Sequence, residues 1–179
     1  EEESIYFKGR EEHIDQATEQ LQRNKFLMLT GASGDGKSSL VYAGIVPNAR
    51  AGFLKSKYTQ WRVADFRPER SPFKNLCRAL ARQLEIANVQ TVEAEIQHGF
   101  SALVDLFKNS KCFVDVESVA WRNADETQKA ALKRTAANLI IIVDQFEEFF
   151  TNPENYHHGV PSQDSNLVLN VLLETARIA

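Results

Sequence analysis

Apolar side chains recur at helical spacing in several polar stretches of the chain. Residues 11–24 carry an apolar position at every third or fourth residue, which is typical of an amphipathic helix. Ser71 fits an N-cap and Pro72 a first helical position, so a further helix is expected to begin there. The same periodicity predicts helices over 72–86, 92–108 and 165–179, and a polar, alanine-rich helix over 125–137.

The stripes of the two helices in the middle of the chain are expected to face a core rather than a binding groove. The first stripe comprises Phe73, Leu76, Cys77, Leu80 and Leu84, and the second comprises Val92, Ile96, Phe100, Leu103 and Phe107. Residues 112–116 fit either a strand or a loop, and that choice stays open.

Short apolar runs predict three strands, over 26–30, 61–66 and 139–143. The last run, Leu-Ile-Ile-Ile-Val, is typical of a strand buried on both faces in a parallel sheet under helices. Val46-Pro47-Asn48 is expected to end the helix that follows the first strand. Loops are expected over 49–59 and 152–164.

The composition is that of an ordinary globular protein. The 179 residues fit one domain, with 43% hydrophobic and 25% charged residues. A net charge of −3 offers no basic footprint for nucleic acid. No apolar run is long enough for a membrane span, and the acidic N-terminus is unlike a signal peptide. Two cysteines are too few for a disulfide framework, so we expect reduced thiols and a cytoplasmic protein.

Residues 31–38 read Gly-Ala-Ser-Gly-Asp-Gly-Lys-Ser and match the phosphate-binding loop Gly-x-x-x-x-Gly-Lys-Ser/Thr. Glycines let backbone N–H groups approach a phosphate closely, and a helix N-terminus adds favourable charge. Lys37 would reach the β- and γ-phosphates, and the Ser38 hydroxyl would bind Mg²⁺. The alternative is a glycine-rich turn with a surface lysine. The nucleotide-binding residues predicted here are Gly31, Ala32, Ser33, Gly34, Asp35, Gly36, Lys37, Ser38 and Ser39.

A second motif lies at the end of the apolar run 139–143. Asp144 follows it directly, as in the Walker B motif, where the carboxylate orders the Mg²⁺ shell. Glu147 and Glu148 come next, and either carboxylate could activate a water molecule. The alternative is a buried strand followed by a solvated acidic turn. Because the motif follows a phosphate loop, we favour the functional interpretation.

Two other features are expected to have no chemistry. His157 and His158 are adjacent in a loop without acidic or thiol partners at ligand spacing, so we expect solvated histidines. Cys77 lies in an apolar helical register and is expected to be a core residue.

Four segments together resemble the STAND class of P-loop NTPases, most closely the bacterial branch often found beside WD40 or other repeat domains. The segments are YFKGREE at 6–12, FLMLTGASGDGKSSLVYAGIVP at 26–47, FRPERSPFKNL at 66–76 and IIIVDQFEEFFT at 140–151. The resemblance covers about residues 5–151 and is uninformative over 87–137.

The resemblance implies a three-layer α/β P-loop NTPase core of the ASCE or AAA+ kind, with a central, mainly parallel sheet. We expect residues 1–179 to be a truncated NTPase domain with Walker A at 31–38 and Walker B at 139–144. Sensor, lid and winged-helix regions of the family are not recognised after residue 151, and the chain lacks an initial Met, so we expect a piece of a longer protein.

The resemblance also changes the interpretation of Gly9 and Arg10. Periodicity alone favours a helix entry with a solvated arginine, whereas related proteins use this region for the adenine and ribose side of the pocket. The implied cofactors are ATP or ADP and Mg²⁺, and the implied catalytic residues are Lys37, Asp144 and either Glu147 or Glu148. Gln145 stands where many related ATPases carry the catalytic glutamate.

The implied function is a nucleotide switch in signalling or defence, whose ATP or ADP state controls assembly. Its expected partners are the nucleotide, further copies of the chain, and effector or sensor domains, without membrane or nucleic acid. We expect ATP hydrolysis in the full-length protein and weak or no turnover by this chain. Two other functions stay open: a motor-like ATPase with continuous turnover, and a non-catalytic scaffold that binds nucleotide.

Overall fold

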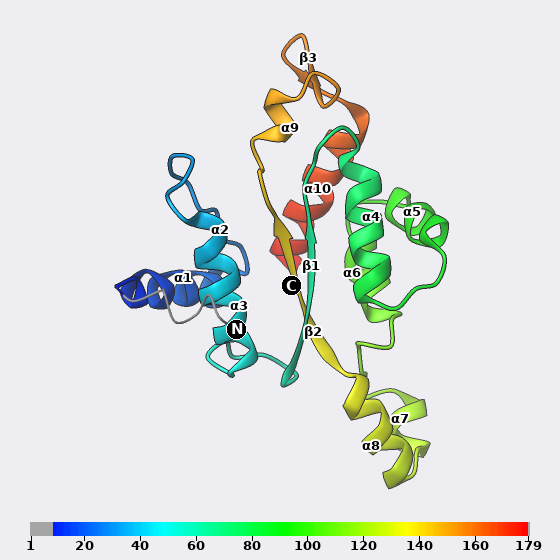
Figure 1. Cartoon of the computed structure of the whole chain (residues 1–179). Helices are drawn as coiled ribbons and strands as arrows, with labels where there is room; N and C mark the ends of the chain where they lie inside the picture. The colour runs from blue at the N-terminus through cyan, green and yellow to red at the C-terminus, as the bar shows by residue number, and fades with distance from the viewer. Residues whose placement is uncertain (1–8, 179) are drawn as a thin grey trace. The chain divides into compact units, whose positions relative to one another are not determined.

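The computed structural model describes residues 9–178, so Tyr6, Phe7 and Lys8 of the predicted signature lie outside the described residues. The chain is of the mixed α/β class and forms two compact units, which divide between Thr59 and Gln60. Each unit is described by itself. Figure 1 shows the helices and strands along the chain. Within residues 9–178, no helix is long and apolar enough to cross a membrane.

The first unit begins with the predicted amphipathic helix, α1 (Glu11–Asn24), which buries Ala17 and Thr18. After the glycine-rich loop, a continuous helical segment comprises α2 (Lys37–Ser39), the π-helix η2 (Leu40–Ile45) and α3 (Val46–Arg50). α1 packs against η2 at Gly44, where an added Cβ would lie 2.7 Å from Cγ1 of Ile14. The missing side chain at Gly44 is therefore what allows the close approach of the two helices.

The predicted helix stop at Val46-Pro47-Asn48 is wrong, because the helix continues to Arg50. Proline lacks an N–H group and would leave a gap in a regular helix. Here Pro47 stands in the first turn of α3, directly after the π-helical turn of η2. The wider turn changes the hydrogen-bonding pattern before the proline, so the helix can include it.

The strand predicted over 26–30 is also wrong as a structural assignment, because these residues form no strand. Phe26 and Met28 are 41% and 53% exposed, whereas Leu27 and Leu29 are half-buried. A strand needs a neighbour that pairs with its backbone N–H and C=O groups. Residues 9–59 contain no strand that could serve as this neighbour.

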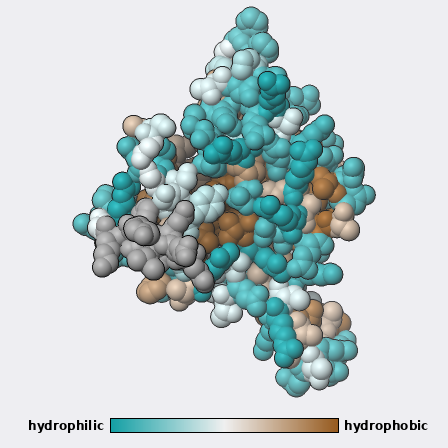
Figure 2. Space-filling model, in the orientation of Figure 1, coloured by the Kyte–Doolittle hydropathy of each residue, from teal (hydrophilic) through white to brown (hydrophobic). Residues whose placement is uncertain are grey.

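The second unit contains two parallel strands, β1 (Gln60–Phe66) and β2 (Ala137–Val143), in the register Gln60↔Ala137 to Phe66↔Val143. Both strands agree with the predicted runs. In β2 only Ala137 is buried and the other residues are half-buried, so the expectation of a strand buried on both faces is wrong. Hydrophobic surface is visible where the strands run (Figure 2). Within the described residues of the second unit, helices pack on one face of this sheet and no third strand joins it.

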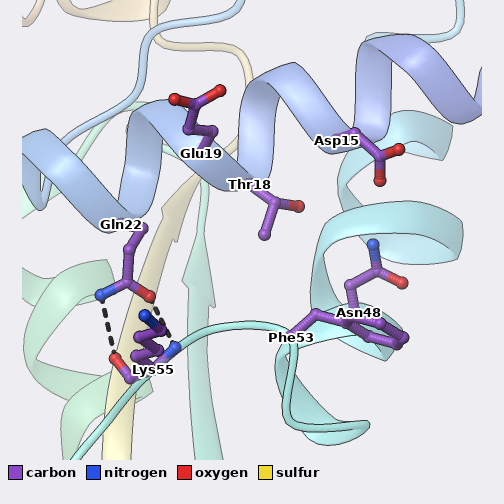
Figure 3. A pocket seen from close by; sticks show the side chains of 7 residues that line it. All are labelled: Asp15, Thr18, Glu19, Gln22, Asn48, Phe53 and Lys55. Atoms are coloured by element: carbon purple, nitrogen blue, oxygen red, sulfur yellow. Dashed lines mark hydrogen bonds between the residues drawn. The ribbon is translucent and has the colours of Figure 1, made fainter.

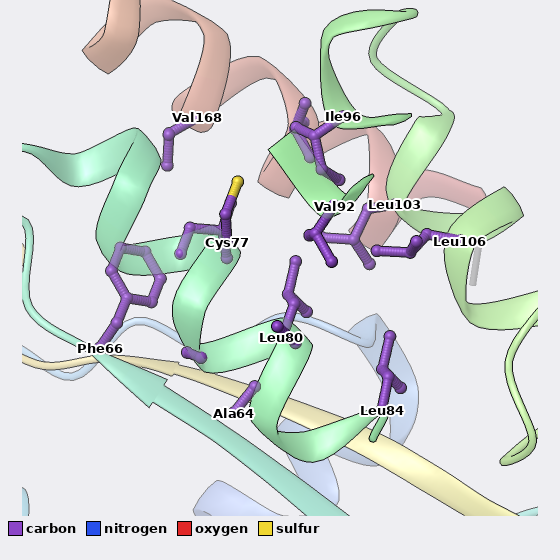
Figure 4. Packing of buried hydrophobic residues seen from close by; sticks show 14 of the residues in the cluster. Ala64, Phe66, Cys77, Leu80, Leu84, Val92, Ile96, Leu103, Leu106 and Val168 are labelled. Carbon is purple, nitrogen blue, oxygen red and sulfur yellow. The ribbon is translucent and has the colours of Figure 1, made fainter. Parts of the chain in front are cut away.

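Four helices form the core beside this sheet. α4 (Pro72–Gln83) packs on β1, and α5 (Val89–Gln97) and α10 (Gln163–Ile178) pack on α4. α6 (Ala102–Lys108) packs on α5 and α10. Apolar side chains from all four helices point toward one another and toward β1 (Figure 4). The buried residues that confirm the predicted stripes are Phe73, Leu76, Cys77, Leu80, Leu84, Val92, Ile96 and Leu103.

The single helix predicted over 92–108 is two helices in the structure, α5 and α6. The chain breaks at His98–Ser101, where Gly99 has a φ of 152°. Phe100 consequently leaves the predicted stripe and is 52% exposed. A glycine within a helical pattern lowers helix propensity by about 1 kcal/mol, and here it ends the helix.

The remaining segments are short. Residues 112–116 form no strand, which settles the open choice in favour of a loop. α7 (Val119–Asn123) precedes α8 (Glu126–Thr135), which Asp125 begins with a capping box. α9 (Glu148–Thr151) is followed by a small hairpin, β3 (Tyr156–His157) and β4 (Val160–Pro161), inside the predicted loop.

Candidate functional site

The glycines of the predicted phosphate loop adopt backbone conformations that other residues avoid. Gly34 and Gly36 have φ values of 89° and 75°, both in the left-handed region. Gly36 stands at the N-cap of the helix that begins with Lys37. The sequence Gly-Lys-Ser therefore enters a helix through a left-handed residue, whereas the residues before the loop form no strand.

Lys37 is folded over its own loop. Its Nζ donates hydrogen bonds to the carbonyl oxygens of Gly31 and Ala32, at 2.9 and 2.8 Å. These carbonyls are neutral acceptors, and a phosphate oxygen is a stronger partner for an ammonium group. The lysine is thus held within reach of the loop by contacts that an anion can replace.

Asp35 places a carboxylate inside the same loop. Its Oδ2 accepts a hydrogen bond from the backbone N–H of Ala32 at 2.6 Å. The same oxygen would lie 2.8 Å from a Cβ at Gly31, so a side chain there would displace the carboxylate of Asp35. One backbone donor of the loop is consequently engaged by an internal anion.

Arg10 lies against the loop. A Cβ added to Gly36 would be 3.6 Å from Nη1 of Arg10, an ordinary contact distance. Arg10 directly precedes α1, and the backbone N–H of Gly9 donates to Oε2 of Glu11 at 2.9 Å. The structure therefore brings Arg10 and the loop together, two segments that the sequence separates by more than twenty residues. The other predicted residues of the loop, Ser33, Ser38 and Ser39, are exposed.

Asp144 continues β2 beyond its last residue. Its backbone N–H donates to the carbonyl oxygen of Phe66 at 3.0 Å, which extends the ladder between the strands. Arg67, the residue after β1, donates to Oδ2 of Asp144 from Nε at 3.1 Å and from Nη2 at 3.0 Å. Oδ1 of Asp144 accepts from the N–H of Gln145 at 3.1 Å. Both carboxylate oxygens are therefore engaged within the second unit.

Arg67 is the functional candidate that sequence reasoning missed. The hydrogen bond and the charge of Asp144 are the main causes that raise the pKa of the Arg67 guanidinium, and the carboxylates of Glu148 and Glu69 add to the shift. The available signal was its position, because Arg67 and Asp144 each directly follow a strand. The strand register, which the sequence does not reveal, is what makes them neighbours.

The two candidate bases differ in their surroundings. Oε2 of Glu148 accepts a hydrogen bond from the backbone N–H of Glu69 at 2.8 Å, so this carboxylate holds the turn after β1. Glu147 is exposed at the start of α9. Gln145, between Asp144 and these glutamates, has a φ of 56°.

Asn155 fixes the same turn from the other side. It is fully buried, and its Nδ2 donates to the carbonyl oxygens of Glu69 and Glu148. Nδ2 of Asn75 on α4 donates to the carbonyl oxygen of Arg67 at 3.0 Å. The backbone that carries Arg67 is thus held at several points.

A separate open cavity of about 310 Å³ lies in the first unit, between α1 and the segment 48–55. Gln22 closes one end by hydrogen bonds with both backbone groups of Lys55 (Figure 3). The lining residues are Asp15, Thr18, Glu19, Gln22, Asn48, Phe53 and Lys55, without any residue of the phosphate loop. The cavity is therefore distinct from the predicted nucleotide-binding residues.

The two loop histidines are exposed and Cys77 lies in the core, as their sequence patterns predict. The rings of His157 and His158 stack on each other at 5.5 Å between centroids. Within residues 9–178 no group of three or more metal-ligating side chains is present. Cys77 is fully buried, and burial raises the pKa of its thiol to about 12, which keeps it unreactive.

The chain is thus a mixed α/β protein with a phosphate-loop sequence at the start of a helix. It belongs to the novel STAND NTPase 1 family, whose family model matches residues 1–178. This match confirms the resemblance and assigns the chain to the nucleotide-binding STAND NTPases. The comparisons found no matching curated protein and no matching solved structure.

Proposed function

We propose that residues 1–179 form a P-loop NTPase domain that binds Mg·ATP and acts as a slow nucleotide switch. In this proposal the domain has the three-layer core of its class, and the ATP or ADP state controls assembly of a signalling or defence protein. Family membership supports nucleotide use, while the Mg²⁺ requirement, the switch and the fold beyond the two parallel strands are parts of the proposal.

The observation that carries the proposal is the arrangement of the phosphate loop. Left-handed Gly36 leads into the helix at Lys37, and the lysine ammonium lies over the loop carbonyls. Arg10 adds a second positive group beside Gly36. Two cations and a helix start at one loop favour a phosphate group over a neutral ligand.

The metal side of the proposal uses Ser38 and Asp144. Mg²⁺ in nucleotide sites takes few protein ligands and prefers hard oxygen donors, which a serine hydroxyl and a carboxylate supply. The ion would neutralise charge on the phosphate oxygens. Asp144 fits the role chemically, because it is a partly exposed carboxylate at a strand end.

For activation of water, Glu147 is the residue that the contacts favour. Glu148 would have to leave the backbone N–H of Glu69, whereas Glu147 is exposed and lies in the first turn after Asp144. A base must reach the water that it deprotonates, so an engaged carboxylate is the poorer candidate. Turnover is expected to be slow, because the sequence has no identifiable arginine finger, and the lack of one alone lowers the rate about 10³- to 10⁵-fold.

Calorimetric titration with ATP and with ADP in Mg²⁺ tests nucleotide binding. Lys37→Ala should weaken binding about 10- to 100-fold, since a hydrogen bond to a charged group contributes about 1.5–3 kcal/mol. Lys74→Ala is the matched control, because Lys74 is an exposed lysine on α4 in the other unit. Equal affinities of the wild type and Lys37→Ala, or no binding by folded wild type, would contradict the proposal.

A further inference from the structure

We infer that Arg67 competes with a divalent cation for the carboxylate of Asp144. This competition sets the cation concentration at which Asp144 begins to bind the cation. The inference rests on the proposed function, because Asp144 meets a metal ion only if the protein uses Mg·nucleotide. It assigns a role to a residue outside both predicted motifs.

Both oxygens of the Asp144 carboxylate already accept hydrogen bonds. Two guanidinium nitrogens of Arg67 converge on Oδ2 of Asp144, at 3.1 and 3.0 Å, and Oδ1 takes the N–H of Gln145. An incoming cation has to share oxygens that already carry these hydrogen bonds. It also has to approach the positive charge of the guanidinium, and two like charges within a few ångströms repel each other.

Arg67 is anchored in a way that allows its side chain to leave. Its carbonyl oxygen is held by Nδ2 of Asn75, while its side chain is 50% exposed. The carboxylates of Glu148 and Glu69 are close enough to act on the guanidinium electrostatically. The displaced side chain would therefore find other negative charges and water without any movement of the backbone.

The alternative role for Arg67 is to orient Asp144 for the metal. The two roles predict opposite signs. If Arg67 orients the carboxylate, removal of the arginine side chain weakens Mg²⁺ binding at Asp144. If Arg67 is a competitor, the same removal strengthens Mg²⁺ binding. The sign of the change therefore distinguishes competition from a structural contribution.

The experiment measures ADP affinity at a series of free Mg²⁺ concentrations and determines the Mg²⁺ midpoint of the increase in affinity. Arg67→Gln should lower this midpoint about 5-fold, a modest factor because partly exposed charges couple weakly. The Mg²⁺ midpoint of Arg67→Lys should lie between those of the wild type and Arg67→Gln, since lysine keeps the charge but lacks the planar pair of donors. Far-UV circular dichroism melts verify that each variant is folded.

Arg82→Gln is the matched control. Arg82 on α4 forms an ion pair of similar length with Asp65 of β1, at 2.8 Å, and its loss should leave the midpoint unchanged. In an Asp144→Asn background, Arg67→Gln should have no effect on the midpoint, because the contested carboxylate is gone.

The outcomes separate the two proposals. A lower midpoint for Arg67→Gln that vanishes in the Asp144→Asn background supports the competition. An unchanged or higher midpoint, with ADP still bound, overturns the role of Arg67 and leaves the proposed function in place. Folded wild-type protein that binds no ADP at any Mg²⁺ concentration overturns the proposed function and this inference with it.

Discussion

Charged side chains of both predicted motifs are already engaged by groups of their own unit. Lys37 donates to two loop carbonyls, Asp35 accepts from Ala32, and Asp144 accepts from Arg67. Binding of a phosphate or a cation would therefore exchange partners rather than fill vacant ones. The net gain of such an exchange is much smaller than the strength of the new contact, as for any hydrogen bond that replaces another.

A single residue, Cys77, is also expected to make the free energy of unfolding depend on pH. Desolvation by burial, with smaller contributions from Glu93 and Asp164, raises the pKa of the folded thiol to about 12 from an ordinary value of 9.0. Between these values the unfolded chain loses the proton and the folded chain keeps it, so the free energy of unfolding falls as pH rises. Below pH 9.0 both states keep the proton and the contribution is constant.

Urea denaturation at pH 7 and pH 10 measures this loss. We expect Cys77 to contribute a loss of about 1 kcal/mol between the two pH values, which Cys77→Ala removes. Cys112→Ala keeps Cys77 and should therefore retain the slope. The same pH dependence in the wild type and Cys77→Ala would contradict the assignment.

The site shows what the sequence revealed and what it did not. The phosphate loop was predicted from the sequence because its chemistry needs fixed residue types at fixed spacing. The family match confirms the resemblance to the STAND NTPases. The contact between Arg67 and Asp144 could not be predicted from the sequence. It depends on the register Phe66↔Val143, which makes the next residue of each strand a neighbour of the other.

At the scale of elements, local patterns predicted helices better than strands. An apolar stripe such as that of α4 is a property of one segment, so Leu76 and Leu80 were placed in the core correctly. An apolar run such as 26–30 states that a strand is possible, but strand formation depends on a partner elsewhere. The errors at Pro47 and Gly99 arose because a π-turn and a helix break both depend on context.

Gly44 makes a testable prediction about the packing of α1 on η2. Gly44→Ala should lower the stability by about 1 kcal/mol, because the overpacking against Ile14 exceeds the gain in helix propensity. In an Ile14→Ala background the obstacle is gone, and the same substitution should become stabilising. Thermal melts of the wild type, the two single variants and the double variant measure the sign of the stability change caused by Gly44→Ala. A destabilising effect in both backgrounds would show that Ile14 is not the obstacle.

At the scale of the whole molecule, the segment 51–59 is the last part of the first compact unit, directly before the division at Thr59 and Gln60. It contains no helix or strand, and the side chain of Lys57 is exposed. Lys55 in the same segment is held at both backbone groups by Gln22. Proteases cleave exposed segments outside helices and strands more readily than the backbone within such elements.

Brief trypsin treatment should therefore cut first after Lys57 and produce fragments 1–57 and 58–179. Intact-mass spectrometry identifies the fragments. Lys57→Gln should slow the first cut several-fold. Lys74→Ala on α4 is the control and should leave the rate of the first cut unchanged. A first cut within α4 or α10 would contradict the division into units.

Strand β2 has a consequence for the behaviour of the protein at high concentration. Within the described residues it pairs with β1 alone, and most of its side chains are only half-buried. An unpaired strand edge can bind the edge of a second molecule, and net charge is what keeps such molecules apart. With an isoelectric point near 5.9, that repulsion is weakest in mildly acidic buffer. Colloidal stability should accordingly improve as the buffer is moved toward pH 8.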